Sequence, residues 1–444
     1  MSVDSRPRRR PIAALTVALA LLIAGCTQNP NSVFHHRTEF NREVSSLFEL
    51  LIVLGTIVFV FTEGMLLYAV VRFRSRPGKP HEPEQVHGNT KLEILWTLIP
   101  AVVLAVIAVP TVRTVFRTQG AARADALQVE VVGHQWWWEF RYPQYNVVTA
   151  NELYLPIGRT VDFALHTHDV LHSFWIPGLG GKRDLVNNRT NHLWFTPDST
   201  TEAAFNGFCA EYCGMSHANM RFRAFAVTSE DFASWIAHQQ TPAAFMAPGM
   251  PGAQAPPATG AQPAKPPGSQ AANQNVARGQ QTTPPPAAGT TGAAAAPTAP
   301  AAVQAGFVAF AREHMPNHAV PKTPIPATIG FDSTLRGDPA RGGMLVSMGA
   351  CIGCHTVKGV PTMVAQTGPD LTHVGSRLTI AAGLFPNDTR HLAAWIKNAR
   401  AMKPGVQMPT LGKGQYDPVT KMTMSVGFTD QQIADIVAYL QALK

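Results

Sequence analysis

Residues 209–220 read Cys209-Ala-Glu211-Tyr-Cys213-Gly-Met-Ser-His217-Ala-Asn-Met220. This stretch places two thiols, an imidazole and a thioether within twelve residues. Soft sulfur ligands combined with imidazole suit copper. The alternative is a disulfide between the two cysteines beside a surface histidine, because paired cysteines of exported proteins often oxidise. A second imidazole, His172, is available upstream, and it favours a metal site.

Short β-type segments precede and follow this stretch, from about residue 126 to residue 237. Leu127, Val129 and Val131 alternate with polar residues, and further runs cover 160–166, 192–195 and 222–227. Turn residues separate the runs, and no long 3.6-residue period appears. The pattern predicts an antiparallel β-sandwich over residues 118–240.

His166 and His168 form the pattern H-T-H-x3-H with His172, which is a possible mononuclear metal site. The Cys/His/Met stretch downstream already supplies a full ligand set, so a surface or supporting role is favoured for both.

Two apolar runs upstream, 47–73 and 94–116, are each long enough to cross the ~30 Å hydrocarbon core as a helix. They predict a transmembrane hairpin over residues 40–117. The loop between them carries Arg72, Arg74, Arg76, Lys79 and Lys91. By the positive-inside rule this loop is cytoplasmic, so we expect everything after residue 117 on the outer side of the membrane.

The first 25 residues resemble a bacterial lipoprotein signal. A basic start is followed by an apolar run, and the run ends in Ile23-Ala-Gly-Cys26. We expect cleavage before Cys26 and lipidation of its thiol. The alternatives are a plain signal peptide and an uncleaved anchor.

The composition also argues for several domains. Charged residues make up only 14% of the 444 residues, against about 25% in ordinary soluble domains. Residues 241–304 are almost entirely Ala, Pro, Gly, Gln and Thr, so we expect a disordered linker. The net charge of +8 is scattered along the chain, and we expect no nucleic-acid partner.

Residues 305–444 have helical periodicity and predict a small all-α domain. Within it, Cys351-Ile-Gly-Cys354-His355 is a CxxCH haem c attachment site. Two thioether bonds would fix the porphyrin, and His355 would be the proximal ligand. The sixth ligand would be a downstream methionine, with these candidates: Met363, Met402, Met408, Met422 and Met424.

The apolar hairpin, the tryptophan run Trp136-Trp-Trp138, the His172 segment and the C-x-E-x-C-x3-H-x2-M stretch together resemble subunit II of haem–copper cytochrome c oxidases. The resemblance covers residues from about 40 to 237. It implies a cupredoxin-like sandwich that holds a dinuclear copper centre, CuA. The resemblance assigns the ligands as follows: Cys209 and Cys213 bridge the coppers, His172 and His217 each cap one ion, Met220 is a weak ligand, and Glu211 binds through its backbone carbonyl.

The same resemblance implies three further roles. The Glu211 side chain would help to hold a Mg²⁺ ion against subunit I. Electrons would enter the copper site through Trp136. Glu93, at the start of the second apolar run, would lie at the mouth of a proton channel, although an interfacial charge is ordinary at a helix start. One departure from the family pattern is Asn187-Asn188, where relatives usually have Pro-Gly, and it leaves the contacts of this loop with subunit I open.

In the C-terminal part, Thr367-Gly-Pro369-Asp-Leu371 and Lys403-Pro-Gly-Val-Gln-Met408 resemble two loops of class I cytochromes c. The resemblance favours Met408 as the sixth haem ligand, with Met402 as the second choice. All five cysteines then have a role, one in lipidation, two in copper binding and two in haem attachment.

We therefore expect subunit II of a bacterial cytochrome c oxidase with a fused cytochrome c domain. Electrons would pass from a donor cytochrome or an upstream complex to haem c, then to CuA and subunit I, where O₂ is reduced and protons are pumped. The chain would lie in the inner membrane, with both cofactor domains on the periplasmic side. The alternatives are the electron-input subunit of a CuA-containing nitric oxide reductase and, in another class, a copper-delivery protein.

Overall fold

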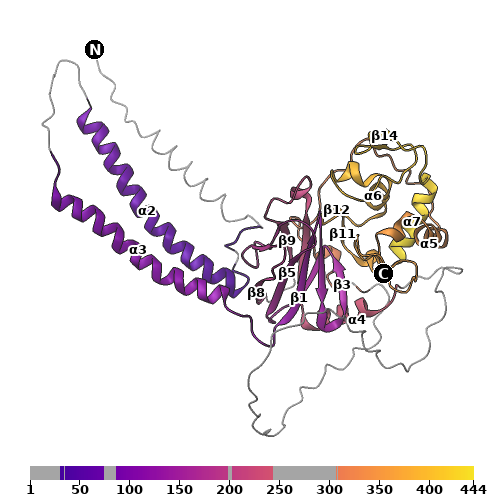
Figure 1. Cartoon of the computed structure of the whole chain (residues 1–444), viewed down its shortest axis with the longest axis horizontal. Helices are drawn as coiled ribbons and strands as arrows, with labels where there is room; N and C mark the ends of the chain where they lie inside the picture. Colours follow the sequence, from indigo (N-terminus) through magenta and orange to yellow (C-terminus); the bar gives the residue numbers. More distant parts are fainter. Residues whose placement is uncertain (1–30, 35, 75–86, 199–202, 244–306, 308) are drawn as a thin grey trace, which may run out of the picture.

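The computed structural model describes residues 31–34, 36–74, 87–198, 203–243, 307 and 309–444. Cys26, the expected signal peptide and most of the expected linker lie outside the described residues. Figure 1 shows two long helices that project from one side of a β-sandwich, and a smaller helical domain on the opposite side.

The two long helices are α2 (Glu39–Phe73) and α3 (Thr90–Gln119), and both are long and apolar enough to cross a membrane. Their most apolar windows have a mean hydropathy of 2.4 and 2.5, and these windows are almost wholly exposed. Exposed apolar helices of this length need a lipid environment. Both helices begin a few residues before the apolar runs, because the side chains of Thr38 and Asn89 cap their first turns.

The first turn of α2 is bound to the sandwich. The Glu39 carboxylate accepts hydrogen bonds from the backbone N–H and the hydroxyl of Thr196, at 2.9 and 2.7 Å. The Asn41 side chain donates to the carbonyl of Pro177 at 3.1 Å, and Arg42 pairs with Asp198. These contacts fix one end of the hairpin to the sandwich.

The sandwich consists of two five-stranded sheets. The first has the order β3-β2-β1-β5-β8, and the second β4-β10-β9-β6-β7. The strands of the first sheet are β1 (Leu127–His134), β2 (Trp137–Tyr142), β3 (Val147–Ala150), β5 (Val161–Thr167) and β8 (Asn191–Phe195). Those of the second are β4 (Glu152–Pro156), β6 (His172–Trp175), β7 (Arg183–Leu185), β9 (Ala203–Cys209) and β10 (Arg221–Val227).

The predicted sandwich is confirmed, but its strands are not all antiparallel. Among the described strands, β1 runs parallel to β5, and β4 runs parallel to β10. Parallel neighbours need a crossover connection rather than a tight turn. The alternation of apolar residues along each strand does not contain that information.

The core between the sheets is aromatic and lies directly under the His172 and Cys209 strands. Phe174 and Phe222 stack at 5.1 Å, and Trp138 packs against both rings. All three side chains are fully buried. Each such aromatic pair contributes about 0.5–1.5 kcal/mol beyond its buried area. The core therefore gives β6 and β9 a rigid base.

The C-terminal domain is built on three helices, which fits the predicted helical domain, and residues 349–388 and 403–429 form long connections between them. The helices are α5 (Pro339–Met348), α6 (Thr389–Met402) and α7 (Asp430–Ala442). Two two-residue hairpins accompany them, β11 (Thr379–Ile380) with β12 (Phe385–Pro386) and β13 (Tyr416–Asp417) with β14 (Met422–Thr423). A capping box of Thr429 and Gln432 starts α7. Gly342 lets α5 cross α7 closely, because a Cβ there would lie 1.9 Å from the carbonyl oxygen of Asp435.

The described connections also contain the twelve-residue helix α4 (Ser229–Gln240). Their short 3-10 helices are η1 (Pro143–Tyr145), η2 (His217–Asn219), η3 (Arg312–His314), η4 (Ala350–Gly353) and η5 (Val374–Ser376). Ala309, Phe310 and Ala319 pack into the core cluster of the sandwich. The buried core of the helical domain contains Ile329 and later residues, together with Ala243. The chain thus crosses the sandwich surface before it enters the helical domain.

Candidate metal and haem sites

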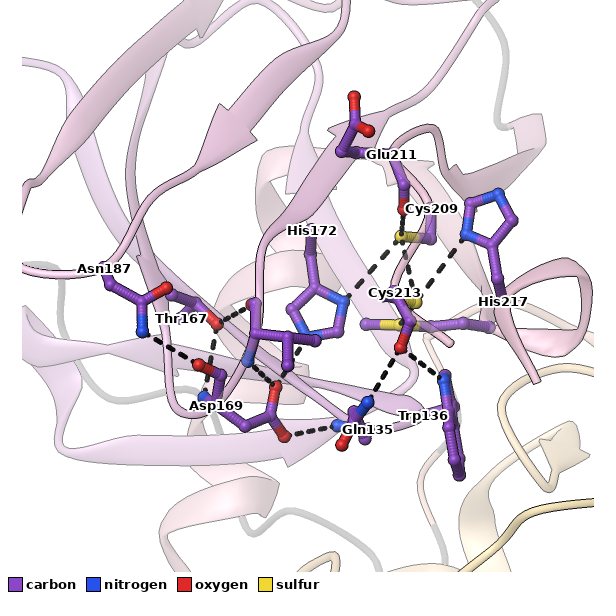
Figure 2. Close-up of polar contacts among 12 residues, drawn as sticks. Gln135, Trp136, Thr167, Asp169, His172, Asn187, Cys209, Glu211, Cys213 and His217 are labelled. Carbon is purple, nitrogen blue, oxygen red and sulfur yellow. Dashed lines mark hydrogen bonds and ion pairs between the residues drawn. The ribbon is translucent and has the colours of Figure 1, made fainter. Parts of the chain in front are cut away.

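The structure brings together the six residues that the sequence predicts as copper ligands. His172 begins β6, Cys209 ends β9, and the other four lie in the loop and short helix that follow. Figure 2 shows the imidazoles of His172 and His217 on opposite sides of the pair of cysteine sulfur atoms. The ligand atoms of His172, Cys209 and Cys213 lie within 4.8 Å of one another.

The distances between these donor atoms fit shared metal ions. The two Sγ atoms are 3.7 Å apart, well beyond the ~2.05 Å of a disulfide. The Nδ1 atom of His172 lies 3.8 Å from Sγ of Cys209, and Nδ1 of His217 lies 3.6 Å from Sγ of Cys213. Two donors on one tetrahedral ion, each about 2.0–2.3 Å from it, are about 3.3–3.8 Å apart. Each histidine is thus placed to share an ion with a different cysteine.

Two weaker donors complete the set. The Met220 sulfur lies 3.8 Å from the Cys213 sulfur, and the Met220 side chain is fully buried. The Glu211 carbonyl oxygen lies 3.2 Å from the Cys209 sulfur. Figure 2 shows the Glu211 carboxylate pointing away from the sulfur atoms, so its backbone and its side chain face different surroundings.

Asp169 holds the second nitrogen of His172, a role that the sequence analysis did not assign. Its Oδ1 lies 2.8 Å from Nε2 of His172, and its Oδ2 accepts from the backbone N–H of Gln135 at 2.7 Å. A metal-binding histidine commonly donates its other N–H to a carboxylate, which fixes the ring and its tautomer. The D-x-x-H spacing, three residues apart, is the sequence signal by which Asp169 could have been found.

The charges of the site favour deprotonated sulfur. The hydrogen bond with Cys213 is the largest influence on the Cys209 thiol; burial opposes it, His172 and backbone groups assist it, and together they lower the pKa to about 4. The pKa of Cys213 is raised, because its proton is shared with the Cys209 thiolate and because it is buried. Burial lowers the pKa of His172, but its contacts with Asp169 and Cys209 outweigh burial and raise it. A bound cation would replace the protons that these groups share.

Trp136 lies against the Cys213 loop. Its Nε1 donates to the Cys213 carbonyl at 3.0 Å, and the Gln135 side chain donates to the same oxygen at 2.8 Å. Gly214 has φ +111°, and a Cβ there would lie 3.1 Å from the Trp136 ring. Glycine at this position therefore lets the indole contact the metal-binding loop directly.

The other residues from the sequence analysis lie away from this cluster. His166 is half-buried and His168 is exposed, and neither belongs to the metal-binding group among the described residues. Asn188 adopts the left-handed conformation at φ 60°, which asparagine tolerates. Asn187 donates to the Asp169 carbonyl at 2.8 Å, so the loop that departs from the family pattern supports the His172 segment. Glu93 accepts from the Asn89 N–H at 3.2 Å and contributes to the cap of α3.

The second site is a cavity of about 280 Å³ in the helical domain, lined by Cys351, Cys354, His355 and Met408. The remaining walls are mostly apolar, which suits a porphyrin. The thiols of Cys351 and Cys354 are free and half-buried on one short turn, η4 and its C-cap. Burial raises the pKa of Cys351 to about 11.

The His355 imidazole is oriented toward this cavity by a backbone contact. Its Nδ1 lies 2.8 Å from the Pro369 carbonyl oxygen, so Nδ1 carries the hydrogen and Nε2 is free to bind a metal. Gly368 allows the loop to approach, because a Cβ there would lie 2.8 Å from Cε1 of the ring. The TGPDL loop identified in the sequence thus sets the tautomer of the predicted proximal ligand.

Met408 alone, among the methionine candidates, lines the cavity in the described structure. Met402 and Met363 are buried elsewhere in the domain, and Met422 is exposed. The His355 and Met408 positions therefore fit a haem with two axial protein ligands.

The cavity also has walls from the sandwich, which include Gln135, Trp136 and Trp137. Lys403, which the sequence analysis did not assign, is buried between the domains and donates to the Trp136 carbonyl at 2.5 Å. Burial lowers the pKa of Lys403 to about 7. Trp136 is therefore in contact with both candidate sites.

Comparison with known proteins gives three matching family models. The transmembrane domain of cytochrome c oxidase subunit II matches residues 37–114, its periplasmic domain matches residues 146–227, and cytochrome c matches residues 339–444. The cytochrome c oxidase subunit 2 of Alkalihalophilus pseudofirmus is 28% identical over 88% of this chain and 85% of the relative. That of Bacillus subtilis is 37% identical over 50% of this chain and 66% of the relative. The probable cytochrome c oxidase subunit 2 of Rickettsia bellii is 30% identical over 46% of this chain and 81% of the relative.

These matches confirm the resemblance found in the sequence. Two membrane-type helices followed by a periplasmic-type domain fit a membrane-anchored subunit of an oxidoreductase complex. The matched domains imply copper in the sandwich and haem in the helical domain, and the donor atoms described above fit both groups. The chain therefore belongs to the cytochrome c oxidase subunit II family and also carries a cytochrome c domain.

Proposed function

We propose that this chain is the electron-input subunit of a bacterial cytochrome c oxidase. Electrons pass from haem c through Trp136 to a dinuclear copper centre, and then to subunit I, where O₂ is reduced to water and protons are pumped. The proposed haem-binding residues are Cys351, Cys354, His355 and Met408. The proposed copper ligands are His172, Cys209, Glu211 (by its carbonyl), Cys213, His217 and Met220.

The observation that carries this proposal is the position of Trp136. Its ring lines the haem cavity, and its Nε1 donates to the carbonyl of the proposed copper ligand Cys213 at 3.0 Å. One side chain therefore connects the wall of one site to the backbone of the other. Two domains that are joined by a linker but exchange no electrons would not need this contact.

The chain's own residues keep both sites in one geometry. Copper and haem supply one-electron chemistry when bound. Asp169 holds the ring of His172, and the Pro369 carbonyl holds the ring of His355, so both imidazoles present a fixed nitrogen. The aromatic core fixes the strands that carry His172 and Cys209. A rigid donor set lowers the rearrangement that accompanies each electron transfer.

The remaining proposed roles come from the family resemblance and from the sequence signals described above. In the proposed orientation α2 and α3 cross the inner membrane, the sandwich and the cytochrome c domain lie in the periplasm, and Cys26 is lipidated on the same side. The Glu211 carboxylate faces subunit I and shares a Mg²⁺ ion with it. Glu93 lies at the cytoplasmic end of α3, at the mouth of a proton channel of subunit I. The electron donor is a cytochrome or an upstream respiratory complex.

The first test is the metal content of the purified chain. The proposal expects two coppers and one iron per chain, and iron without copper contradicts it.

The second test follows reduction of haem and copper after rapid mixing with a reductant. Trp136→Phe removes the hydrogen bond to Cys213 and slows electron transfer from haem to copper. Trp137→Phe is the matched control, because Trp137 also lines the cavity but stacks on His134 at 4.1 Å instead. Equal rates in the two variants would contradict the route through Trp136.

A further inference from the structure

The second sheet of the sandwich is buried on both faces at one edge. All five residues of β4 are buried, and in the neighbouring β10 only Arg221 is not. A sheet that packs on a core with one face and meets water with the other alternates buried and exposed residues. The outer face of the β4–β10 pair must therefore be covered by another part of the chain.

Two charged residues lie side by side on this covered face. Glu152 on β4 and Arg223 on β10 are register partners, and their exposed fractions are 2% and 4%. Charged side chains are almost never buried to this extent unless they are paired or hydrogen-bonded. We call Glu152 and Arg223 the docking pair.

The hydrogen bonds of Glu152 go to the cytochrome c domain. Its Oε1 accepts from the backbone N–H groups of Leu378 and Thr379, both at 2.8 Å, and from the Thr379 hydroxyl at 3.1 Å. These groups stand at the start of the β11–β12 hairpin. One carboxylate oxygen of the sandwich therefore receives three donors from a segment more than 220 residues away in the sequence.

Arg223 binds the other end of the same hairpin turn. Its Nη2 donates to the Gly383 carbonyl at 3.1 Å, and its Nε donates to the Ala319 carbonyl at 2.6 Å. The carboxylate thus accepts hydrogen bonds from N–H groups at the start of the hairpin. The guanidinium donates a hydrogen bond to a carbonyl at the end of its turn. The two charges match the polarity of the hairpin backbone.

The hairpin has an unusual backbone at this contact. Ala381, Ala382 and Gly383 all adopt the left-handed conformation, with φ of 55°, 63° and 72°. This region is unfavourable for a residue with a Cβ atom, and such residues persist only where surrounding contacts hold them. Within this segment Arg223 donates to the Gly383 carbonyl. Nζ of Lys403 lies 3.4 Å from the Ala381 carbonyl oxygen and also donates to the Trp136 carbonyl.

We propose that Glu152 and Arg223 are positioning residues that dock the β11–β12 hairpin of the cytochrome c domain on the sandwich and thereby hold the haem cavity against Trp136. The hairpin residues Thr379, Ile380, Ala381 and Ala382 themselves line that cavity. The cytochrome c domain is then a docked partner with one defined pose. The significance of this pose for electron transfer rests on the proposed function, whereas the docking itself does not.

The test is retention of the cytochrome c domain after the chain is cut. A protease recognition sequence is inserted within residues 244–306 of the full, haem-loaded chain, and the cleaved protein is diluted. Haem absorbance then reports the dissociation constant of the released fragment from the membrane-anchored part. This measurement does not depend on electron transfer, so its failure is distinguishable from failure of the proposed function.

Glu152→Leu should weaken retention by about 10- to 100-fold, because two buried N–H groups lose their acceptor. Glu152→Gln keeps an oxygen acceptor at the same place and should stay within about threefold of the natural chain by the same reasoning. Arg223→Met removes the hydrogen bonds that β10 donates to the Gly383 and Ala319 carbonyls, and it should also weaken retention. This variant tests the proposal independently if the Leu variant does not fold.

The matched control is Glu130→Leu, which removes a carboxylate from β1 in the other sheet. Glu130 forms only a long ion pair of 3.8 Å with Arg141, and its side chain is 38% exposed. Its loss should leave retention unchanged. Unchanged retention in both Glu152→Leu and Arg223→Met overturns the proposal, as does an equal loss in Glu130→Leu. A Gln variant as weak as the Leu variant overturns the assignment of Glu152 as an acceptor.

Discussion

Replacement of Asp169 by alanine tests whether the residues around the copper ligands set the affinity of the site. The Asp169 carboxylate contacts Nε2 of His172 at 2.8 Å. It also accepts hydrogen bonds from the N–H groups of Gln135 and Val170, both at 2.7 Å. Asp169→Ala removes these three contacts and leaves the proposed copper ligands in place.

The expected loss of copper affinity depends on which of these contacts changes when copper binds. The two bonds to backbone N–H groups are made with or without metal, so their loss lowers the stability of the fold by about 1 kcal/mol each. The bond to His172 makes the imidazole a stronger ligand and fixes its tautomer. A charge-assisted hydrogen bond is worth about 1.5–3 kcal/mol, which corresponds to about a 10- to 100-fold loss of copper affinity.

The assay is competition for copper between the purified chain and a chelator of known affinity, together with thermal unfolding of the metal-free protein. The matched control is Asp162→Ala, which breaks a similar carboxylate–histidine contact of 3.2 Å to His192, an exposed histidine on β8. Copper affinity should fall in the Asp169 variant and stay unchanged in the control. Unchanged affinity in Asp169→Ala, or the same loss in Asp162→Ala, would refute the reasoning.

Two further predictions concern the cytochrome c domain. Met408→Leu should lower the reduction potential of the haem, while Met402→Leu should leave it unchanged, because only Met408 lines the cavity; potentiometric titration of both variants checks this, and a shift in the Met402 variant alone would favour the second choice. Docking of the Glu152→Gln variant, from which the raised pKa of Glu152 and its opposite pH dependence are absent, should weaken in acid: burial and the neighbouring ring of His238, and in smaller part Arg377, lower the pKa of His373 to about 4 at the interface. A depressed pKa makes docking strongest above the ordinary value of about 6.5 and weakens it as the pH falls toward 4, by at most about 3 kcal/mol. Retention of the cleaved domain that stays constant between pH 7 and pH 4.5 would contradict this.

Much of the fold is predictable from local signals. The apolar runs of α2 and α3 are long and apolar enough to predict membrane-spanning helices. The capping box of Thr429 and Gln432 marks the start of α7 because it depends on residues three apart. The alternation along β1 reports one buried face, but it contains nothing about which strand lies beside it, so the parallel pairs β1–β5 and β4–β10 could not be predicted.

The residues of the candidate sites were also only partly predictable from the sequence. The motifs around Cys209 and Cys351 carry most of their ligands within a few residues, so their spacing indicates a metal site and a haem attachment site, and the family resemblance assigns the individual copper ligands. Asp169 is three residues from His172, but its role depends on the ring orientation, which only the folded β6 strand determines. The resemblance of its loop to class I cytochromes c already favoured Met408 over Met402, and Met408 is the one of the two that lines the cavity.

The sequence by itself determined which groups this protein can bind, because metal and haem ligands must have particular atoms at short spacing. Only the tertiary structure decided how the two sites meet. Glu152 and Thr379, and Trp136 and Lys403, are more than 220 residues apart in the chain. Contacts at such separation depend on the packing of whole domains, and burial of Glu152 and Arg223 becomes favourable only when the hairpin backbone supplies their hydrogen-bond partners.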